Sequence, residues 1–292
     1  MSRIHIIWNP VAGNGAAAAA FEKVDARLKE LKIDYTEARS EYAGHAVLLA
    51  KEAVEAGHEL IVAMGGDGTV REVATSMLGS DIPLGIIPCG TGNDLSRPLK
   101  IPREPLAALD TALNGKQRRM DAARANDEIF FNVAGFGFDV DVLDYVLIYK
   151  KKYKNGSIAY LRGLIAAIKG LKARRTVIET PEGTFTTNVM ILACGNGTHF
   201  GGGMCVTPEA DPFDGLLDVC IAHDVKKWML PYLLPKFIRG KHLGLKNITY
   251  FKTTKLSARC EPISRIEVDG EIMQGTPVTV EVLPASISVM VS

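Results

Sequence analysis

Apolar residues in the first 113 positions of the chain follow two kinds of pattern. Short continuous apolar runs that end at glycine or proline are typical of buried strands, and longer segments with apolar positions every three to four residues are typical of helices. The strand pattern covers residues 4–8, 33–38, 60–64 and 84–87. The helix pattern covers residues 16–31, 44–56, 70–78 and 105–113. Because the two patterns alternate, we predict an α/β domain with a mostly parallel sheet.

The pattern changes near residue 118. Residues 118–125 and 128–133 alternate between polar and apolar positions on either side of Asn126 and Asp127, which predicts a hairpin. Further short strands are predicted at residues 176–180, 184–195, 217–221, 248–256, 266–268 and 278–283. This spacing favours a mostly antiparallel β-sandwich. We therefore predict an α/β domain over residues 1–125 and a β-rich domain over residues 126–285, and the alternating residues 286–292 can return to the first domain.

Length and composition agree with two domains. The chain has 292 residues and is 47% hydrophobic, enough for one large core or two moderate ones. A net charge of +1 argues against nucleic acid as the partner. The five cysteines are widely spaced and include no Cys-x-x-Cys pair, which fits a reduced, cytoplasmic protein better than a disulfide framework or a zinc site. Without a signal-peptide layout or an apolar run of membrane-spanning length, we expect any membrane contact to be peripheral.

The first segment that indicates chemistry is Gly65-Gly-Asp-Gly-Thr69, between a predicted strand and a predicted helix. Glycines lack Cβ, so backbone N–H groups can approach a phosphate closely, and a helix N-terminus adds positive partial charge at the same place. Asp67 would repel that phosphate unless Mg²⁺ lies between them or the carboxylate is directed at a hydroxyl group. An ordinary turn explains the same residues, because Gly and Asp are common in turns.

A second loop, Pro88-Cys-Gly-Thr-Gly-Asn-Asp94, repeats this design after the next strand. It has two glycines around Thr91, and Asn93 and Asp94 are placed to cap a helix. Consecutive parallel strands end at the same edge of a sheet, where α/β proteins bind ligands. We therefore expect the two loops to form one site.

These two loops and the earlier Asn9-Pro-Val-Ala-Gly13 together resemble the diacylglycerol kinase catalytic superfamily, in its soluble bacterial lipid kinase branch, which is related to sphingosine kinases. The first loop is shared with NAD kinases and phosphofructokinase-like proteins, whereas Gly90-Thr-Gly-Asn-Asp94 is more discriminating. The resemblance covers most of the chain and implies an NAD kinase or phosphofructokinase-like first domain that binds ATP and Mg²⁺. The nucleotide-binding residues that it implies are Asn9, Pro10, Gly13, Ser40, Gly65, Gly66, Asp67, Gly68, Thr69, Gly90, Thr91, Gly92, Asn93, Asp94 and Asp121.

Three positions depart from the family pattern. Asn14 stands where some members carry Lys, so a phosphate contact there would come from N–H groups. Ser40 stands where a nucleotide-contacting Thr is usual, and its hydroxyl can make the same contact or cap the next helix. Arg71 stands where Asn is common, so the contacts near the Asp67 loop are expected to differ from the family pattern.

Carboxylates in the β-rich half form two groups. Asp211-Pro-Phe-Asp-Gly-Leu-Leu-Asp218 offers hard oxygen ligands, and in the resembling family such a turn binds a structural Mg²⁺. Carried over, the ligands are the Asp214 side chain and the carbonyls of Asp211 and Leu216; a metal-free β-turn is the alternative. The second group is Glu267-Val-Asp-Gly-Glu271 at a predicted hairpin tip. The resemblance makes Glu271 the proton acceptor, with Asp67 orienting the hydroxyl or the metal, whereas residue pattern alone fits solvated acids.

Two basic segments bear on membrane contact. Residues 149–154 form a Lys- and Tyr-rich run, and residues 226–241 mix Trp, Leu and Phe with flanking cations. Both suit an anionic lipid surface, although solvated charge and core packing are alternatives, and Pro231 and Pro235 interrupt a clean amphipathic helix.

The resemblance favours an ATP- and Mg²⁺-dependent kinase of a lipid hydroxyl group, with diacylglycerol as the acceptor and phosphatidic acid as the product. It implies a cytoplasmic protein that meets its lipid substrate by peripheral contact at the inner membrane surface. Alternatives are a kinase of phosphatidylglycerol, ceramide or a sphingoid base, an NAD kinase-like enzyme, and a non-catalytic lipid- or nucleotide-binding regulator. A homodimer is left open.

Overall fold

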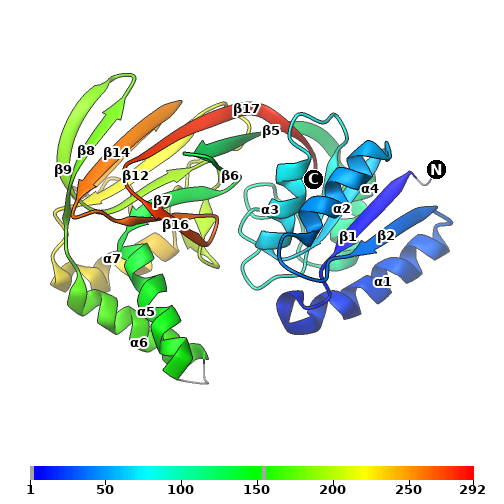
Figure 1. Ribbon diagram of the computed structural model, residues 1–292, viewed down its shortest axis with the longest axis horizontal. Helices are drawn as coiled ribbons and strands as arrows, with labels where there is room; N and C mark the ends of the chain where they lie inside the picture. The colour runs from blue at the N-terminus through cyan, green and yellow to red at the C-terminus, as the bar shows by residue number, and fades with distance from the viewer. Residues whose placement is uncertain (1–2, 153–155) are drawn as a thin grey trace.

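The computed structural model describes residues 3–152 and 156–292 and has two lobes (Figure 1). The first lobe contains a parallel sheet in the order β4 (Leu84–Pro88), β3 (Leu60–Gly65), β1 (Ile4–Trp8) and β2 (Tyr35–Arg39). Every residue of β3 and β4 is buried, as expected for central strands, while β2 is half exposed at the edge. The predicted parallel α/β domain is confirmed.

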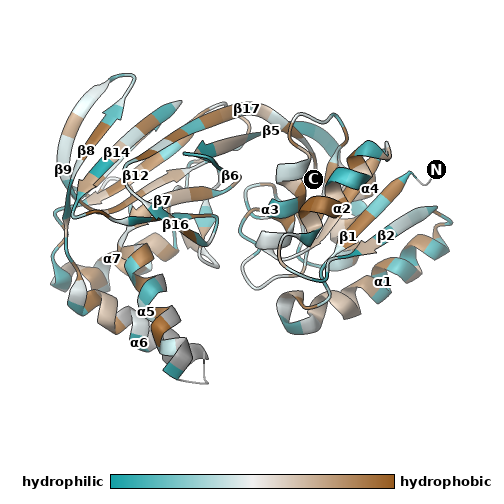
Figure 2. Ribbon diagram, viewed as in Figure 1, coloured by the Kyte–Doolittle hydropathy of each residue, from teal (hydrophilic) through white to brown (hydrophobic). Residues whose placement is uncertain are grey.

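Helices join these strands. They are α1 (Ala16–Glu30), α2 (His45–Glu55), α3 (Asp67–Ser76) and α4 (Pro105–Asn114), with the 3-10 turn η1 (Ala12–Gly15) before α1. Small and branched side chains on one face of each helix pack into a single core with the strands, while hydrophilic residues occupy the other face (Figure 2). α3 begins at Asp67, three residues earlier than predicted, so the Asp67 loop and the helix N-terminus coincide.

The second lobe is mostly antiparallel, as predicted. Its strands are β6 (Glu128–Phe130), β7 (Val133–Gly137), β8 (Arg174–Thr180), β9 (Gly183–Gly195), β10 (His199–Phe200), β11 (Met204–Cys205), β12 (Leu217–His223), β13 (Ile248–Thr253), β14 (Lys255–Glu261), β15 (Arg265–Val268) and β16 (Glu271–Gly275). Pairing is antiparallel throughout, including β7 with β9, β8 with β14 and β15 with β16. The segment 248–256, predicted as one strand, is divided at Thr254 between β13 and β14.

Two long strands cross both lobes. β5 (Lys116–Ala125) pairs antiparallel with β17 (Val278–Val291), which Figure 1 shows as a red ribbon that runs from the second lobe to the first. Residues 278–283 and 286–292, predicted as separate strands, belong to this one strand, whose register shifts between Leu283 and Ile287. Beyond the shift, β17 pairs in parallel with β4 at Val289 and Leu84. The C-terminal segment therefore joins the first lobe's sheet.

Three helices of the second lobe were not predicted. α5 (Phe138–Lys152) and α6 (Gly156–Gly170) pack against each other, and α7 (Leu230–Ile238) follows the turn η2 (Lys227–Met229). The expectation that Pro231 and Pro235 interrupt an amphipathic helix is wrong, because Pro231 lies in the first turn of α7 and the helix continues through Pro235. Within the predicted basic run 149–154, residues 153 and 154 lie outside the described residues. No described helix combines the length and the apolar character needed to cross a membrane.

Candidate active site

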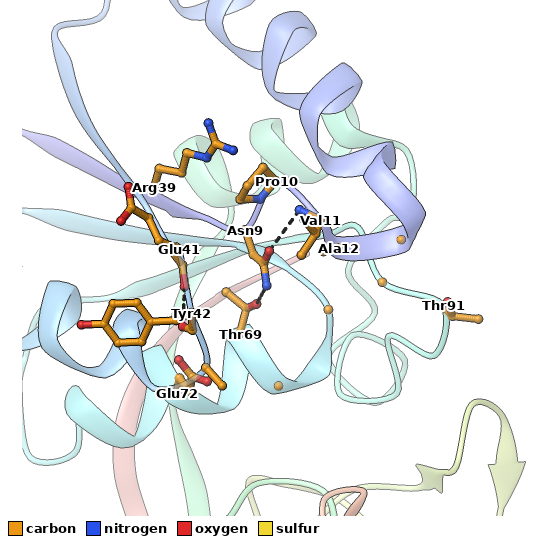
Figure 3. A pocket seen from close by; sticks show the side chains of 16 residues that line it. Asn9, Pro10, Val11, Ala12, Arg39, Glu41, Tyr42, Thr69, Glu72 and Thr91 are labelled. Carbon is orange, nitrogen blue, oxygen red and sulfur yellow. Dashed lines mark hydrogen bonds between the residues drawn. The ribbon is translucent and has the colours of Figure 1, made fainter. Parts of the chain in front are cut away.

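A cavity of about 730 Å³ opens where β1, β2, β3 and β4 end (Figure 3). Its lining includes many of the predicted nucleotide-binding residues: Asn9, Pro10, Gly13, Ser40, Gly66, Gly68, Thr69, Gly90 and Thr91. Asn9 links two of the loops, since its Nδ2 donates to Thr69 Oγ1 at 3.3 Å while its Oδ1 accepts the Val11 N–H. The structure therefore brings the three predicted glycine loops to one cavity.

The backbones of the glycine loops contact one another directly, without side chains between them. A Cβ atom on Gly90 would lie 2.5 Å from the Cα of Gly66, and one on Gly13 would lie 2.1 Å from the Cys89 carbonyl oxygen. Gly13 also has φ of +60°, a conformation that favours glycine. Any side chain at these positions would force the loops apart, so glycine is required for the shape of the cavity.

Asp67 avoids the conflict with phosphate by pointing at the next loop. Its Oδ2 accepts the N–H of Asn93 at 2.8 Å and its Oδ1 accepts the N–H of Asp94 at 2.6 Å. Asn93 in turn closes its own loop through two hydrogen bonds with the Gly90 backbone. The carboxylate thus fixes the second glycine loop against the N-terminus of α3. Gly65 is buried at the end of β3, beneath Thr69.

A second cavity, of about 350 Å³, lies between the lobes. Asp67, Thr91, Gly92 and Asp94 line it from the first lobe, so it adjoins the larger cavity at Thr91. The second lobe contributes the aromatic side chains Phe131 and Phe200, and the polar groups Asn132, Gly201, Gly202, Asp269 and Gly270. A molecule with a polar end and an apolar body would match this lining.

Asp94 connects the two lobes at this cavity. Its Oδ2 accepts the Gly202 N–H at 2.7 Å, and burial raises the pKa of the Asp94 carboxyl, with the nearby Asp67 acting in the same direction. Arg97 Nε lies 3.5 Å from Oδ1, and this oxygen accepts no hydrogen bond from any described residue. Two close carboxylates favour a cation, and Arg97 supplies that positive charge at Oδ1, so a divalent cation bound through Asp94 would compete with Arg97.

The predicted Asp-Gly-Glu hairpin tip lies opposite α3. Asp269 is part-buried and accepts N–H groups of Phe131, Asn132 and Val133, while desolvation of its carboxyl raises the pKa to about 6. These bonds anchor the tip between β15 and β16. The Glu271 side chain, 62% exposed, forms an ion pair with Arg71 at 2.7 Å. Glu271 thereby contacts α3, the helix that carries Asp67 at its N-terminus, while Glu271 itself is not among the residues that line the smaller cavity.

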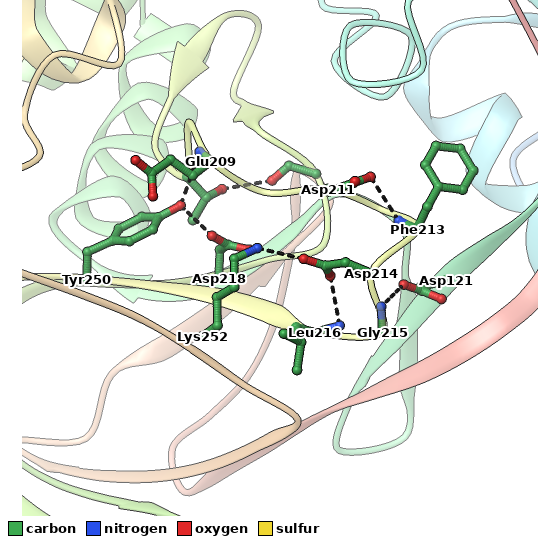
Figure 4. A network of polar contacts seen from close by, with 12 residues as sticks. Asp121, Glu209, Asp211, Phe213, Asp214, Gly215, Leu216, Asp218, Tyr250 and Lys252 are labelled. Atoms are coloured by element: carbon green, nitrogen blue, oxygen red, sulfur yellow. Dashed lines mark hydrogen bonds and ion pairs between the residues drawn. The ribbon is translucent and has the colours of Figure 1, made fainter.

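Asp121 and the predicted metal turn lie elsewhere (Figure 4). The Asp121 carboxylate accepts the N–H groups of Gly215 and Ala285, each at 2.7 Å, and so ties the turn to the register shift of β17. Asp121 is not among the residues lining either cavity. Its predicted place in a nucleotide-linked metal network stays a prediction.

In the metal turn, the Asp214 carboxylate already has two partners. Its Oδ1 accepts the Leu216 N–H at 3.0 Å, and its Oδ2 pairs with Lys252 Nζ at 2.7 Å, which also contacts Asp218 (Figure 4). The Asp211 carbonyl accepts the Asp214 N–H at 3.3 Å. Within the described part of the chain, no group of three or more His, Cys, Asp or Glu side chains is arranged to hold a metal. A Mg²⁺ ion bound through Asp214 would have to displace the ammonium of Lys252.

Replacing Lys252 with methionine should make this turn responsive to Mg²⁺. Without the ammonium, Asp214 and Asp218 lose their cation, and a divalent ion can take its place. We expect MgCl₂, added without nucleotide, to raise the Tm of Lys252→Met by several degrees more than that of the wild type. Lys255→Met, which removes a more exposed neighbouring cation, is the control. An equal response in all three proteins would contradict the expectation.

Comparison with known proteins identifies the family. Residues 3–125 match the family model of the diacylglycerol kinase catalytic domain, and residues 132–291 match that of the YegS C-terminal NAD kinase beta sandwich-like domain. A diacylglycerol kinase of Mycobacterium tuberculosis (strain H37Rv) is 30% identical, over 99% of this chain and 95% of its own length. The chain belongs to the diacylglycerol kinase family. It is therefore a lipid kinase.

Other relatives of this lipid kinase agree in length and fold. A diacylglycerol kinase of Bacillus subtilis (strain 168) is 30% identical, over 93% of this chain and 90% of its own length. A crystal structure from Bacillus anthracis (strain Sterne) superimposes with a TM-score of 0.81 at 25% identity, covering 100% of this chain and 98% of the other. Both lobes therefore belong to the family fold.

Sequence reasoning missed several residues of this lipid kinase's site. Arg39, the last residue of β2, and Tyr42 line the larger cavity on either side of the predicted Ser40 (Figure 3). Phe131 and Asn132 line the smaller one, although they precede β7 in what resembled a plain strand. Arg71 lines the smaller cavity too, and its departure from the family pattern was the only sequence signal of its contact with Glu271.

Proposed function

We propose that this lipid kinase transfers the γ-phosphoryl group of ATP to the free hydroxyl group of diacylglycerol and releases phosphatidic acid and ADP. The observation that carries the proposal is the pair of adjoining cavities. Glycine loops line the larger cavity. The smaller cavity lies between the lobes and is lined by the polar side chain of Asp67 and the aromatic side chains of Phe131 and Phe200. The first suits a nucleotide, and the second suits the polar end and the first apolar carbons of a lipid. The names of its relatives support diacylglycerol as the acceptor.

Phosphoryl transfer needs alignment, charge neutralisation and a proton acceptor. The N–H groups of the glycine loops orient the phosphates. Asp67 and Asp94 are the residues that would hold Mg²⁺, which would replace Arg97 as the cation at Asp94 and when bound would neutralise phosphate charge. Glu271 accepts the proton of the acceptor hydroxyl group. At the same time the hydroxyl oxygen forms a bond to the γ-phosphorus of ATP, and the bond between the γ-phosphorus and the β–γ bridging oxygen breaks to release ADP. Asp67 keeps the second glycine loop in place during this step.

The acceptor is tested by offering diacylglycerol, phosphatidylglycerol, ceramide, sphingosine and soluble NAD in parallel, with ATP and Mg²⁺, and identifying the products by mass spectrometry. Phosphatidic acid as the main product would support the proposal. A different phosphorylated lipid would replace the acceptor but keep the mechanism, and phosphorylated NAD would favour the NAD kinase-like alternative. Nucleotide binding without any product would favour a regulator.

The lipid acceptor requires contact with a membrane, and α7 provides a suitable surface. Leu230, Leu233 and Phe237 are buried in the core of the second lobe. Trp228, Tyr232 and Ile238 are, in contrast, 76%, 57% and 56% exposed. Exposed aromatic and apolar residues on a surface helix are typical of interfacial membrane contact.

The charge around α7 complements an anionic membrane. No Asp or Glu occurs between Asp224 and Glu261, whereas exposed cations surround the helix. These are Lys226, Lys227, Arg239 and Lys241. α7 also contacts β11, and the β10–β11 loop carries Gly201 and Gly202 into the smaller cavity. Contact through α7 would therefore place the lipid-binding cavity near the bilayer.

Two variants, Trp228→Ser and the double variant Lys226→Glu/Lys241→Glu, should each bind more weakly to vesicles that contain phosphatidylglycerol. Each cation near such a surface contributes about 1 kcal/mol, so the charge reversal should lower the partition coefficient by about tenfold or more. Vesicle sedimentation measures this. Phe185→Ser, which removes an exposed aromatic residue of β9, is the control. Equal binding by all variants would contradict the assignment of α7.

A further inference from the structure

The guanidinium group of Arg71 donates three hydrogen bonds to residues of the second lobe. Its Nη1 donates to Glu271 at 2.7 Å, its Nη2 donates to Glu128 at 3.2 Å, and its Nε donates to the Ile129 carbonyl oxygen at 3.1 Å. All three donor directions of the guanidinium are therefore used. The side chain is only 14% exposed, so solvent screens these bonds less than it would on an open surface.

These contacts join the two lobes across the smaller cavity. Arg71 belongs to α3 in the first lobe, whereas Glu128 and Ile129 belong to β6 and Glu271 to β16 in the second lobe. Arg71 itself lines the cavity, as do Asp67 and Asp269. The Glu271 carboxylate is otherwise largely exposed, and a free Glu side chain would sample several rotamers. The ion pair restricts it to the side of α3.

We propose that Arg71 is a positioning residue: it holds the Glu271 carboxylate against α3, beside the acceptor cavity that Arg71 itself lines, and couples that placement to the spacing of the lobes. This inference rests on the proposed function, in which Glu271 accepts the proton of the acceptor hydroxyl. A misplacement of a reacting group by about 1 Å can cost a factor of about 10² in rate. Arg71 therefore acts on turnover through Glu271 without touching the phosphoryl group.

Arginine is required here because its donors lie in one plane and point in three directions. A lysine has a single ammonium group on a flexible stem, which cannot reach the β6 carbonyl and both carboxylates together. Lysine would keep the charge but lose the fixed geometry. Arg71→Lys therefore tests whether positive charge alone is sufficient. Arg71→Met removes both the charge and the hydrogen-bond donors but keeps an apolar side chain as long as the aliphatic stem of arginine.

The test compares kcat and KM of Arg71→Met, Arg71→Lys, Glu271→Gln and the double variant Arg71→Met/Glu271→Gln. We expect Arg71→Met to lower kcat by about 10²-fold and to change the KM for ATP by less than about twofold, because Arg71 does not line the nucleotide cavity. Arg71→Lys should recover only part of the loss. In the Glu271→Gln background, Arg71→Met should cost little more. Arg119→Met, which removes a more exposed arginine that pairs with Asp81 and lines neither cavity, is the control and should leave kcat unchanged.

Equal losses from Arg71→Met in the wild-type and Glu271→Gln backgrounds would overturn the proposal, because Arg71 would then act on something other than Glu271. Full recovery by Arg71→Lys would also overturn it. If the wild type phosphorylates no lipid, the proposed function fails, and the contact is tested by thermal unfolding of the same four proteins. Tm losses of the single variants that do not add in the double variant would support the coupling of Arg71 and Glu271, and additive losses would contradict it.

Discussion

Glu271→Gln lowers kcat by roughly 10² to 10⁴-fold and leaves the KM for ATP within about twofold of the wild type. Glutamine keeps the size of the side chain and can still accept a hydrogen bond from Arg71, but it cannot take a proton from an alcohol. Glu271 does not line the nucleotide cavity, so ATP should bind as before. Steady-state kinetics with diacylglycerol in mixed micelles, together with calorimetric binding of ATP, measure the two effects separately.

The matched control for this variant is Glu182→Gln, an exposed carboxylate in the turn between β8 and β9. It should leave kcat unchanged. A Glu271→Gln protein with wild-type turnover would contradict the role of Glu271. A rise in the KM for ATP with unchanged kcat would instead assign Glu271 to nucleotide binding.

Asp67→Asn lowers kcat by roughly 10² to 10³-fold and, unlike Glu271→Gln, also destabilises the first lobe. In the wild type both carboxylate oxygens accept N–H groups of the second glycine loop. An asparagine presents an NH₂ group to one of those N–H donors, which leaves a part-buried donor unpaired at a cost of about 1–3 kcal/mol. The loop that lines both cavities through Thr91 loses its fixed position.

Differential scanning calorimetry should show a Tm reduced by several degrees for Asp67→Asn, because 1 kcal/mol corresponds to about 2–4 °C in a protein of this size. Asp81→Asn, whose side chain is 98% exposed, is the control and should change neither Tm nor kcat. An Asp67→Asn protein with lower kcat and an unchanged Tm would show that Asp67 acts on the reaction alone. Unchanged turnover would contradict its place in the site.

The parallel lobe was predictable from sequence because its signals are local. Each strand is a continuous apolar run, and each glycine loop follows one directly. The same local argument failed for α5, since Phe138, Val140 and Val142 alternate with aspartates in the period of a strand. For α7, two prolines concealed a helix that packs on the second lobe's core. In both segments tertiary packing determines that a helix forms, and the period of the apolar residues does not reveal that packing.

The contacts that shape the candidate site were harder to predict because their partners are distant in the chain. Arg71 pairs with a carboxylate 200 residues later, and Lys252 reaches back to Asp214 from a different strand. Only the fold brings such residues together, at the smaller cavity for Arg71 and at the separate turn before β12 for Lys252. The family resemblance predicts roles for Glu271 and Asp67, whereas it does not predict the ion pairs of Arg71 and Lys252.

The most direct test of the account is transfer of label from γ-labelled ATP to diacylglycerol in mixed micelles with Mg²⁺, comparing the wild type with Glu271→Gln under conditions where both bind ATP. The account predicts labelled phosphatidic acid from the wild type and a loss of roughly 10² to 10⁴-fold in the variant. Equal labelling by the two proteins would remove Glu271 from the mechanism. Absence of label in any lipid, with ATP still bound, would contradict the proposed lipid kinase reaction for these acceptors.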